Sequence, residues 1–427
     1  MTTRITTENI TDATIGTADL ASSVPLNTQW QSVKTASFTA VAGEGYFVDT
    51  TSTAITVTLP ASPSAGDVVV LKDYARTWDT NAVSIASALF DGATSTTTFS
   101  TIGQTITLVY MDGTKGWSLI NEDTTTGLGA TFISATGGTI TTSGDYKIHS
   151  FTGDGCFVVS SIGNPAGSDS VDYIVVAGGG GGGNNRGGGG AAGGFREGYN
   201  PGSYTASPLA TTALPVSAST YPITVGGGGA GSPESNSGFL GGCGSNSVFS
   251  TITSAGGGGG GTGKATPSRT GLNGGSGGGG GSGNDVGGPG GSGNTPPVSP
   301  PQGNPGGNAV GGSPGPSRKA GGGGGATVAG TNGVACACFS GGGAGATTVI
   351  TGSPVAYAGG GGGGVCTCEG GPGGTGGGGN GGKDNGPSAA GTANTGGGGG
   401  GGGRENTSYA DGSAGGKGIV IIRYKFQ

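Results

Sequence analysis

The chain has 427 residues, of which 109 are glycine, and its formal net charge is −6. Nucleic-acid binding needs a basic stripe against the phosphates. This acidic chain has none, so nucleic acid is excluded as an expected partner. No apolar stretch approaches the ~20 residues that cross a bilayer, and residues 1–12 lack the apolar segment of a signal peptide. We therefore expect neither export by a signal peptide nor membrane insertion.

The glycines are unevenly distributed. Residues 1–176 hold 17 of them and residues 177–427 hold the other 92. This change in composition, together with the strand patterns described below, divides the chain into three expected parts. They are an N-terminal segment (1–28), a β-sandwich domain (29–123) and a glycine-rich domain (124–427) with a β-structured lead-in (124–176).

The N-terminal segment carries apolar residues five positions apart, at Ile5, Ile10, Ile15 and Leu20. This spacing fits neither a helix of 3.6 residues per turn nor an alternating strand. The Ile-x-Asp-x-x-Ile pattern resembles the short repeats of trimeric phage-fibre stalks. That resemblance implies a homotrimer attached to other virion tail proteins, and a flexible tail is the alternative.

Residues 29–123 read as a compact β-domain. Polar and apolar residues alternate at 55–59 and 105–110, and further strand candidates lie at 68–71 and 117–120. Turn residues such as Pro60, Gly66 and the Asp-Gly pairs separate these segments. Many short strands in ~95 residues predict a sandwich or jelly roll. Trp78 and Trp117 are expected in its core.

The lead-in contains three expected strands. Residues 145–151 and 155–159 are predicted to pair as a hairpin, and residues 172–177 run directly into the glycines of 178–183. We expect His149 to be structural, and Cys156 and Cys243 to lie in the core.

Runs of consecutive glycine recur through the rest of the chain, each after a short apolar or polar segment. A flexible linker is one interpretation, because glycine loses the most conformational entropy on ordering. The runs have similar lengths, however, and strand-like segments that favour burial flank them. A collagen helix needs strict Gly-X-Y and is excluded.

The ordered alternative is a lattice of polyglycine II helices. A polyproline-II-like run has no internal hydrogen bonds, so its N–H and C=O groups must be satisfied by neighbouring runs. Runs without side chains can approach closely on all sides. Six to eight glycines would span about 19–25 Å at ~3.1 Å per residue. The predicted fold is therefore all-β, with a domain of packed polyglycine II helices and flanking strands.

The order of segments carries a family resemblance. The stretches YKIHSFTGDGCFVV, VDYIVVAGGGGGG, GGFREG, YPITVGGGG, SVFSTITSAGGGGGG and GGKGIVIIRYKF occur in turn over residues 145–427. They resemble the glycine-rich domain of tail-fibre proteins of marine and cyanobacterial phages, and of fibre-tip adhesins with sandwiched polyglycine helices. The resemblance implies a virion protein that is made in the host cytoplasm and whose loops contact a host receptor.

Function would then lie in the connections between runs. If successive runs alternate in direction, successive connections emerge at opposite ends, and one end faces the receptor. Aromatic residues and arginine dominate binding hot spots. The candidate contacts are Tyr199, Tyr204, Arg269, Arg318, Lys319 and Tyr409. For each of them, a solvated loop residue is the alternative.

Four cysteines form two C-x-C pairs, Cys336/Cys338 and Cys366/Cys368. Two such arms could supply a tetrathiolate zinc site, although zinc sites favour C-x₂-C spacing. Disulfides outside the reducing cytoplasm or free thiols are the preferred interpretations. The pairs depart from the resembled family. We expect no other cofactor.

Enzymatic activity is not expected. His149 is the sole histidine, and no G-x-S-x-G motif in a strand–turn–helix context accompanies it. Matches to G-x-G-x-x-G are trivial in polyglycine and open no βαβ unit, and the acidic residues are scattered rather than paired as in a depolymerase. The first hypothesis is an adhesin that binds a host glycan or outer-membrane protein. The alternative is a purely structural virion fibre or capsid decoration. An ice-binding or cell-wall protein is less favoured because no regular Gly-x-x repeat is present.

Overall fold

The computed structural model describes residues 28–120, 131–164, 167–233, 238–264, 268–283, 286–311, 318–334, 340–365, 369–384, 386–405 and 408–427. Contacts separate the chain into two compact units, Met1–Ala130 and Thr131–Gln427. Almost all of the predicted N-terminal segment and the expected boundary at 123/124 lie outside the described residues. The described structure is all-β, as predicted. No helix within it is long and apolar enough to span a membrane.

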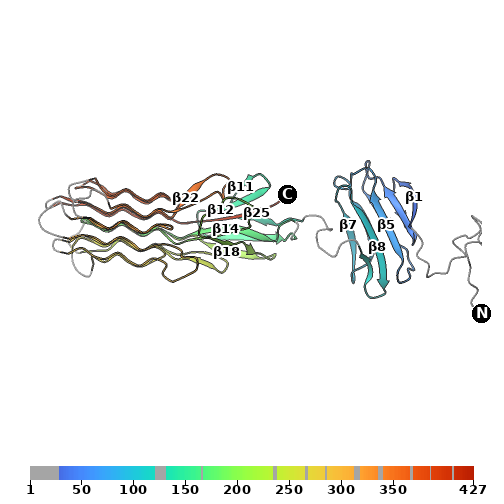
Figure 1. The fold of residues 1–427 in the computed structure, drawn as a ribbon, viewed down its shortest axis with the longest axis horizontal. Coiled ribbons are helices and arrows are strands. Elements are labelled where there is room, and N and C mark those ends of the chain that lie inside the picture. Colours follow the sequence, from blue (N-terminus) through green and yellow to red (C-terminus); the bar gives the residue numbers. More distant parts are fainter. Residues whose placement is uncertain are drawn as a thin grey trace, which may run out of the picture. The chain divides into compact units, whose positions relative to one another are not determined.

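The first unit holds one nine-stranded sheet, in the order β1-β3-β5-β8-β9-β6-β4-β2, with β7 on β6 (Figure 1). Its strands are β1 (Gln29–Lys34), β2 (Phe38–Thr39), β3 (Glu44–Val48), β4 (Ile55–Thr58), β5 (Val68–Asp73), β6 (Val83–Phe90), β7 (Ala93–Phe99), β8 (Thr105–Asp112) and β9 (Gly116–Leu119). The sheet folds over a single core that includes Trp78 and Trp117, as predicted.

The strand pairing in this unit differs from the antiparallel pattern of a jelly roll. β1, β3 and β5 pair in parallel, and so do β2, β4 and β6. From β1 to β6, consecutive strands therefore belong to different halves of the sheet, and the connection 59–67 crosses between the two halves rather than closing a hairpin. Antiparallel pairing occurs for β8 with β5 and β9, and for β7 with β6.

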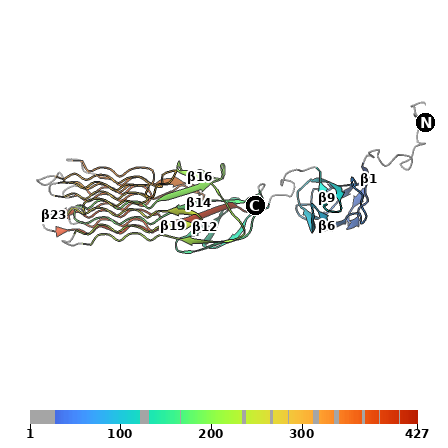
Figure 2. The same cartoon turned by 90° about the horizontal axis from the view of Figure 1, so that it is seen from below.

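The second unit begins with two sheets packed face to face. One has the order β10-β13-β18-β19-β20, and the other β11-β12-β25-β14-β15-β16, with β17 on β14 (Figures 1 and 2). The strands are β10 (Ser134–Thr136), β11 (Thr139–Ser143), β12 (Tyr146–Phe151), β13 (Gly155–Ser161), β14 (Ser170–Val176), β15 (Phe195–Tyr199), β16 (Ala210–Thr212), β17 (Leu214–Pro215), β18 (Thr220–Thr224), β19 (Ser247–Phe249), β20 (Ile252–Ser254) and β25 (Ile419–Lys425). Two short hairpins complete the unit: β21 (Ala346–Thr348) with β22 (Val355–Tyr357), and β23 (Arg404–Glu405) with β24 (Ser408–Tyr409).

The central strands β14 and β25 are buried on both faces. Val171, Tyr173 and Val175 of β14 enter the core between the two sheets. Ile174 and Val176 enter a second core on the opposite face. Strands covered on both sides read as continuous apolar runs, which explains VDYIVV and IVIIRYK.

The predicted hairpin between residues 145–151 and 155–159 is wrong. β12 pairs with β11 and β25, whereas β13 pairs with β10 and β18 in the other sheet. Phe151 and Phe157 both enter the core between the sheets. The short connection therefore turns the chain from one sheet to the other around that core.

The glycine runs extend from these sheets as parallel and antiparallel neighbours (Figures 1 and 2). Within run 177–183, amides three residues apart donate to the same neighbouring run. The amides of Gly178 and Gly181 donate to one run, at the carbonyls of Ser245 and Gly242 respectively. Those of Gly179 and Gly182 donate to a second run, at Gly416 and Ser413, and those of Gly180 and Gly183 to a third, at Ala191 and Gly188. All six distances are 2.8–3.0 Å. A period of three without internal hydrogen bonds is the polyglycine II pattern.

The carbonyls of the same run accept from three further runs. Gly257 and Gly260 donate to it from one, Gly229 and Ser232 from a second, and Gly399 and Gly402 from a third. Run 177–183 therefore has six neighbours and is fully buried. Hydrogen bonds between runs replace a side-chain core, which confirms the predicted lattice.

Side chains cap the margin of the lattice where a neighbouring run is missing. The Oδ1 atoms of Asn308 and Asn380 accept from the amides of Gly290 and Gly373, at 3.0 and 2.8 Å. Asn273 does the same for Ser292 at 2.7 Å. An asparagine carbonyl thus takes the place of a backbone carbonyl at the edge.

Candidate functional site

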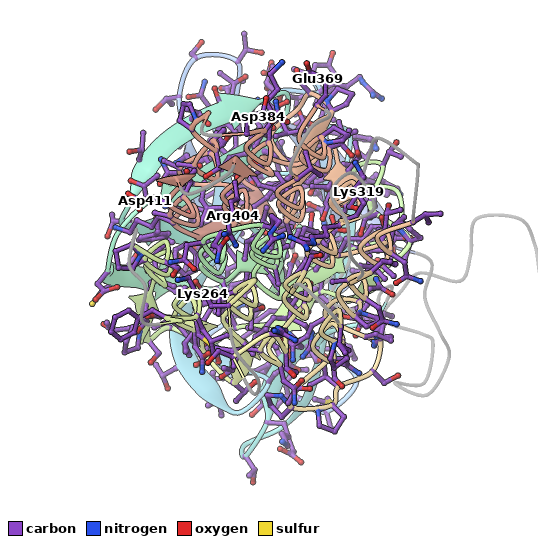
Figure 3. All side chains as sticks on the ribbon, turned by 90° about the vertical axis from the view of Figure 1, so that its left-hand side faces the viewer. Lys264, Lys319, Glu369, Asp384, Arg404 and Asp411 are labelled. Carbon is purple, nitrogen blue, oxygen red and sulfur yellow. The ribbon has the colours of Figure 1, made fainter. Side chains whose placement is uncertain are left out.

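The glycine runs alternate in direction, which is the condition under which successive connections emerge at opposite ends. Run 177–183 leads away from β14, run 187–194 returns to β15, and the last pair, 396–403 and 410–418, leads out and back to β25. The connections between an outward and a returning run therefore gather at the end of the lattice away from the sheets. We call this end the distal face (Figure 3).

The centre of the distal face is the turn Asn184–Asn185–Arg186. Asn185 and Arg186 both have a φ of 56°, a left-handed conformation that non-glycine residues rarely adopt. The turn is completely enclosed. Two hydrogen bonds of the Asn184 side chain hold the turn in place. Thr262 Oγ1 donates to Asn184 Oδ1 at 2.7 Å, and Asn184 Nδ2 donates to the Pro233 carbonyl at 2.7 Å. The two amide atoms of Asn185 make no hydrogen bond.

Four of the predicted contact residues lie at the distal face: Arg269, Arg318, Lys319 and Tyr409. Arg269 ties two connections together, donating through Nη1 to the Val286 carbonyl at 3.3 Å and through Nη2 to the Lys264 carbonyl at 3.1 Å. Lys319 is buried, and its backbone bridges to Val310 and Val365. The backbone of Tyr409 pairs with Arg404. Arg269 and the backbones of Lys319 and Tyr409 therefore take part in the construction of the face.

Charges of both signs occupy the distal face, among them Lys264, Lys319, Arg404, Glu369, Asp384 and Asp411 (Figure 3). Lys383 Nζ lies 2.7 Å from Glu369 Oε1 in an ion pair whose side chains are mostly exposed. A hollow of about 380 Å³ lies beside this pair, lined also by Pro372, Asn380 and Pro387. Exposed ion pairs of this kind contribute little to the stability of the fold, so both side chains can exchange their partner for a group of a bound molecule.

Tyr199 and Tyr204 lie at the opposite end, beside the sheets, where Tyr199 ends β15. The Tyr204 hydroxyl donates to Oε1 of the buried Glu197 at 3.0 Å. Thr348 Oγ1 donates to the same oxygen at 2.5 Å, and the Ser207 amide to Oε2 at 2.9 Å. Burial, followed by the neighbouring Glu197 charge, raises the pKa of Tyr204. The structure therefore does not bring these two tyrosines together with the other four candidates.

Two buried charged residues, Asp172 and Arg423, lie next to this network, on paired positions of β14 and β25. The Arg423 guanidinium donates to the carbonyls of Ile350 at 3.1 Å and Ser203 at 2.9 Å. Its Cζ lies 4.1 Å from the centre of the Tyr146 ring. Burial raises the pKa of Asp172, while hydrogen bonds from Asn200 and the Arg423 charge oppose this effect.

Sequence reasoning did not single out Asp172, Glu197 or Arg423. The signal was present for two of them, because Asp172 and Arg423 are each a charged residue inside an otherwise apolar strand sequence. A charge in such a position is buried only with a partner. The sequence does not show that these two residues are neighbours, because all residues of the lattice lie between β14 and β25 along the chain.

The cysteines and the histidine have the following places. Cys156 and Cys243 are exposed free thiols, so their expected core positions were wrong. Cys156 lies on the solvent-facing side of β13. Cys243 lies on an outer run, in which Gly241 is buried and Cys243 faces the solvent. Cys336, Cys338, Cys366 and Cys368 lie outside the described residues. His149 is buried and hydrogen-bonded, as expected for a structural residue.

The family comparison agrees with this architecture. The glycine-rich domain family matches residues 152–425, which is more than half of the chain. No curated protein matches the sequence. The matched range begins directly after β12 and ends with the last residue of β25, so it spans the lattice and the strands β14 and β25 that lead into and out of it. The chain belongs to the glycine-rich domain family.

Proposed function

We propose that this protein is a receptor-binding adhesin of a phage tail fibre, without catalytic activity, which attaches the virion to a host glycan or outer-membrane protein through its distal face. One observation carries the proposal. The alternating direction of the runs collects the variable connections at one end of a rigid support. A scaffold that holds many loops in fixed positions is suited to recognition.

The rigidity of the support follows from its hydrogen bonds. Each inner run is bonded on several sides, so no single run can move without breaking contacts to its neighbours. Binding by such a face avoids the entropy of ordering loops from a flexible chain. The proposal includes assembly as a homotrimer on the virion with other tail proteins, by analogy with trimeric fibres.

The test is binding of the labelled full-length chain to bacterial cells that adsorb virions carrying it, with virion adsorption measured in competition. We expect saturable binding that blocks adsorption. Two matched variants locate the contact. Asp411→Arg reverses an exposed charge at the distal face, and Asp145→Arg reverses an exposed charge beside the sheets.

Loss of binding in Asp411→Arg with retention in Asp145→Arg would support the distal face as the contact surface. A correctly folded chain that binds no host cell and does not compete would favour the alternative, a structural fibre or capsid decoration. Equal loss in both variants would indicate a general charge effect instead of recognition by the distal face.

A further inference from the structure

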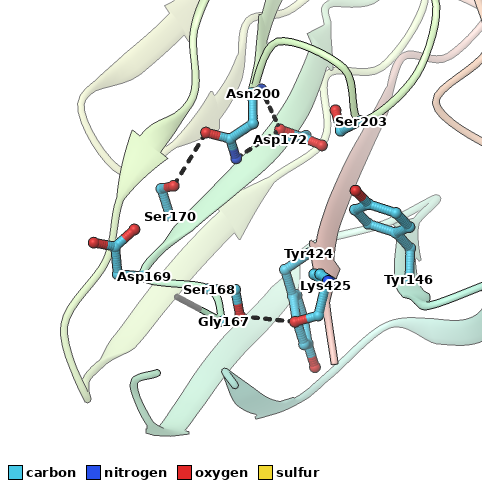
Figure 4. A pocket seen from close by; sticks show the side chains of 10 residues that line it. All are labelled: Tyr146, Gly167, Ser168, Asp169, Ser170, Asp172, Asn200, Ser203, Tyr424 and Lys425. Atoms are coloured by element: carbon cyan, nitrogen blue, oxygen red, sulfur yellow. Dashed lines mark hydrogen bonds between the residues drawn. The ribbon is translucent and has the colours of Figure 1, made fainter. Parts of the chain in front are cut away.

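A separate polar pocket, shown from close by in Figure 4, lies among the sheets of the second unit, away from the distal face. It has a volume of about 200 Å³. The residues that line it are Tyr146, Gly167, Ser168, Asp169, Ser170, Asp172, Asn200, Ser203, Tyr424 and Lys425. They come from β12, β14, β25 and the connections beside β14 and β15, so the two-sheet framework positions them.

Hydrogen-bonding groups on the pocket wall are held in place by one another. The Asn200 amide and Nδ2 both donate to Asp172 Oδ1, at 2.6 and 3.1 Å. Ser170 Oγ donates to Asn200 Oδ1 at 3.3 Å, and Ser168 Oγ donates to the Lys425 carbonyl at 2.7 Å. Asp172 is 1% exposed, so its carboxylate is fixed at the bottom of the pocket. Donors and acceptors therefore face the same small volume from several sides.

The charges in and around the pocket restrict the ligand. Two carboxylates, Asp169 and Asp172, line the pocket together with one cation, Lys425, so the lining carries no excess of positive charge that would favour an anion. Divalent metals need several convergent ligands, and the described residues contain no group of three His, Cys, Asp or Glu side chains able to hold one. The Arg423 guanidinium beside Asp172 opposes a cationic ligand. With anions, metal ions and cations disfavoured, the remaining class of ligand is neutral. Because the wall offers both donors and acceptors, a ligand rich in hydroxyl groups suits it.

The size and the aromatic wall narrow the class further. Pockets for drug-sized ligands measure roughly 300–1,000 Å³, so this one suits a single small ring. The Tyr146 ring borders the pocket (Figure 4). The Arg423 guanidinium packs against this ring, with its Cζ 4.1 Å from the ring centre. Amphipathic rings of this kind offer an apolar surface beside polar partners. We propose that the pocket binds one neutral sugar residue, with its hydroxyls paired to Asp172, Asn200 and Ser170 and its ring beside Tyr146.

This site is distinct from the distal face and does not depend on host binding there. A protein with both sites would bind a saccharide in this pocket and its receptor at the distal face. The ligand expected for this pocket is neutral, whereas the distal face presents charged side chains to its partner.

The test is saturation-transfer NMR on the full-length chain with the methyl glycosides of glucose, galactose, mannose and N-acetylglucosamine. We expect saturable binding of at least one of them. Ser170→Phe fills the pocket from a partly exposed position and should weaken binding at least tenfold. Asn200→Ala removes a wall amide and should weaken it less. Ser219→Phe adds the same ring to an exposed position outside the pocket and should leave binding unchanged.

The proposal is overturned if none of the four glycosides binds the folded chain. It is also overturned if Ser170→Phe and Ser219→Phe bind equally well, or if methylammonium or acetate displaces the sugar from the same site. Circular dichroism and the thermal midpoint of each variant show whether the fold is intact. A folded Asn200→Ala chain tests the same site independently if Ser170→Phe fails to fold.

Discussion

The amide of Gly399 donates to the carbonyl of Gly180 at 2.9 Å, although Gly180 lies in the first glycine run after β14 and Gly399 in the last outward run. Contacts of this kind between distant segments define the lattice. They require that neither residue carry a side chain. A Cβ on Gly180 would lie 2.2 Å from the carbonyl oxygen of Gly258, and one on Gly399 would lie 2.1 Å from that of Ser413.

The first prediction concerns this steric requirement. Gly180→Ala should destabilise the second unit by about 3 kcal/mol, because overpacking against fixed backbone cannot be relieved by a rotamer change. The free energy of unfolding in denaturant measures the effect. Gly227→Ala is the control, since a Cβ there meets nothing within 4 Å. Similar losses in the two variants would argue against close packing of the inner runs.

The second prediction concerns pH and His149. Its Nδ1 lies 2.7 Å from the Gly137 carbonyl, which can only accept, so Nδ1 carries the proton and Nε2 accepts from the Tyr424 hydroxyl at 3.2 Å. Burial lowers the pKa of His149. The folded state therefore binds the proton more weakly than the unfolded state, and the stabilising contribution is present above the ordinary pKa and is lost as pH falls through the folded value.

The NMR titration of His149 measures this directly, because the chain contains one histidine. Its midpoint should lie below the ordinary value near 6.5. An unshifted midpoint would contradict the buried, neutral imidazole. Asp172 acts in the opposite sense, because its raised pKa makes the folded state bind a proton more readily and favours folding as pH falls. Stability against pH should therefore be compared in an Asp172→Asn background.

The third prediction concerns Asp172 and Arg423, two buried charged residues on paired positions of β14 and β25. Arg423→Met should destabilise the second unit by roughly 3–5 kcal/mol. It removes the guanidinium that donates to the carbonyls of Ile350 and Ser203, and it leaves the buried Asp172 carboxylate without a nearby positive charge. The double variant with Asp172→Asn should recover part of this loss. A double-mutant cycle of unfolding free energies measures the coupling. Additive losses would show that the two charges do not interact.

Much of the lattice could be predicted from the sequence because glycine permits few ordered solutions. Consecutive glycines exclude the collagen repeat, and their backbone groups need partners, so a hydrogen-bonded lattice follows. The strands expected at 55–59, 68–71, 105–110 and 117–120 were also confirmed. The first and third of these carry the alternation that reports a half-buried strand directly. Alternation does not report which strand is the partner. This is why the parallel pairing in the first unit and the separation of β12 from β13 were not foreseen.

The candidate site was less predictable. Tyr199 and Tyr204 follow a glycine run in sequence just as Arg269 precedes one, yet they lie beside the sheets and Arg269 lies at the distal face. The end at which a connection emerges depends on whether the preceding run leads away from the sheets or returns. The buried network of Glu197 depends on Thr348, which reaches it from a separate hairpin. Contacts of such long range leave no local signature.

The measurement that tests the lattice most directly is hydrogen–deuterium exchange of the full-length chain, followed by mass spectrometry of peptides that cover residues 177–194. The amides of the two inner runs in this range are enclosed and hydrogen-bonded to neighbouring runs, so they should exchange only as fast as the second unit unfolds. Peptides from the outer run 410–418, where Asp411 and Ala414 are exposed, should exchange partly. Exchange of residues 177–194 at the rate of an unstructured glycine peptide would contradict the lattice and favour a flexible linker.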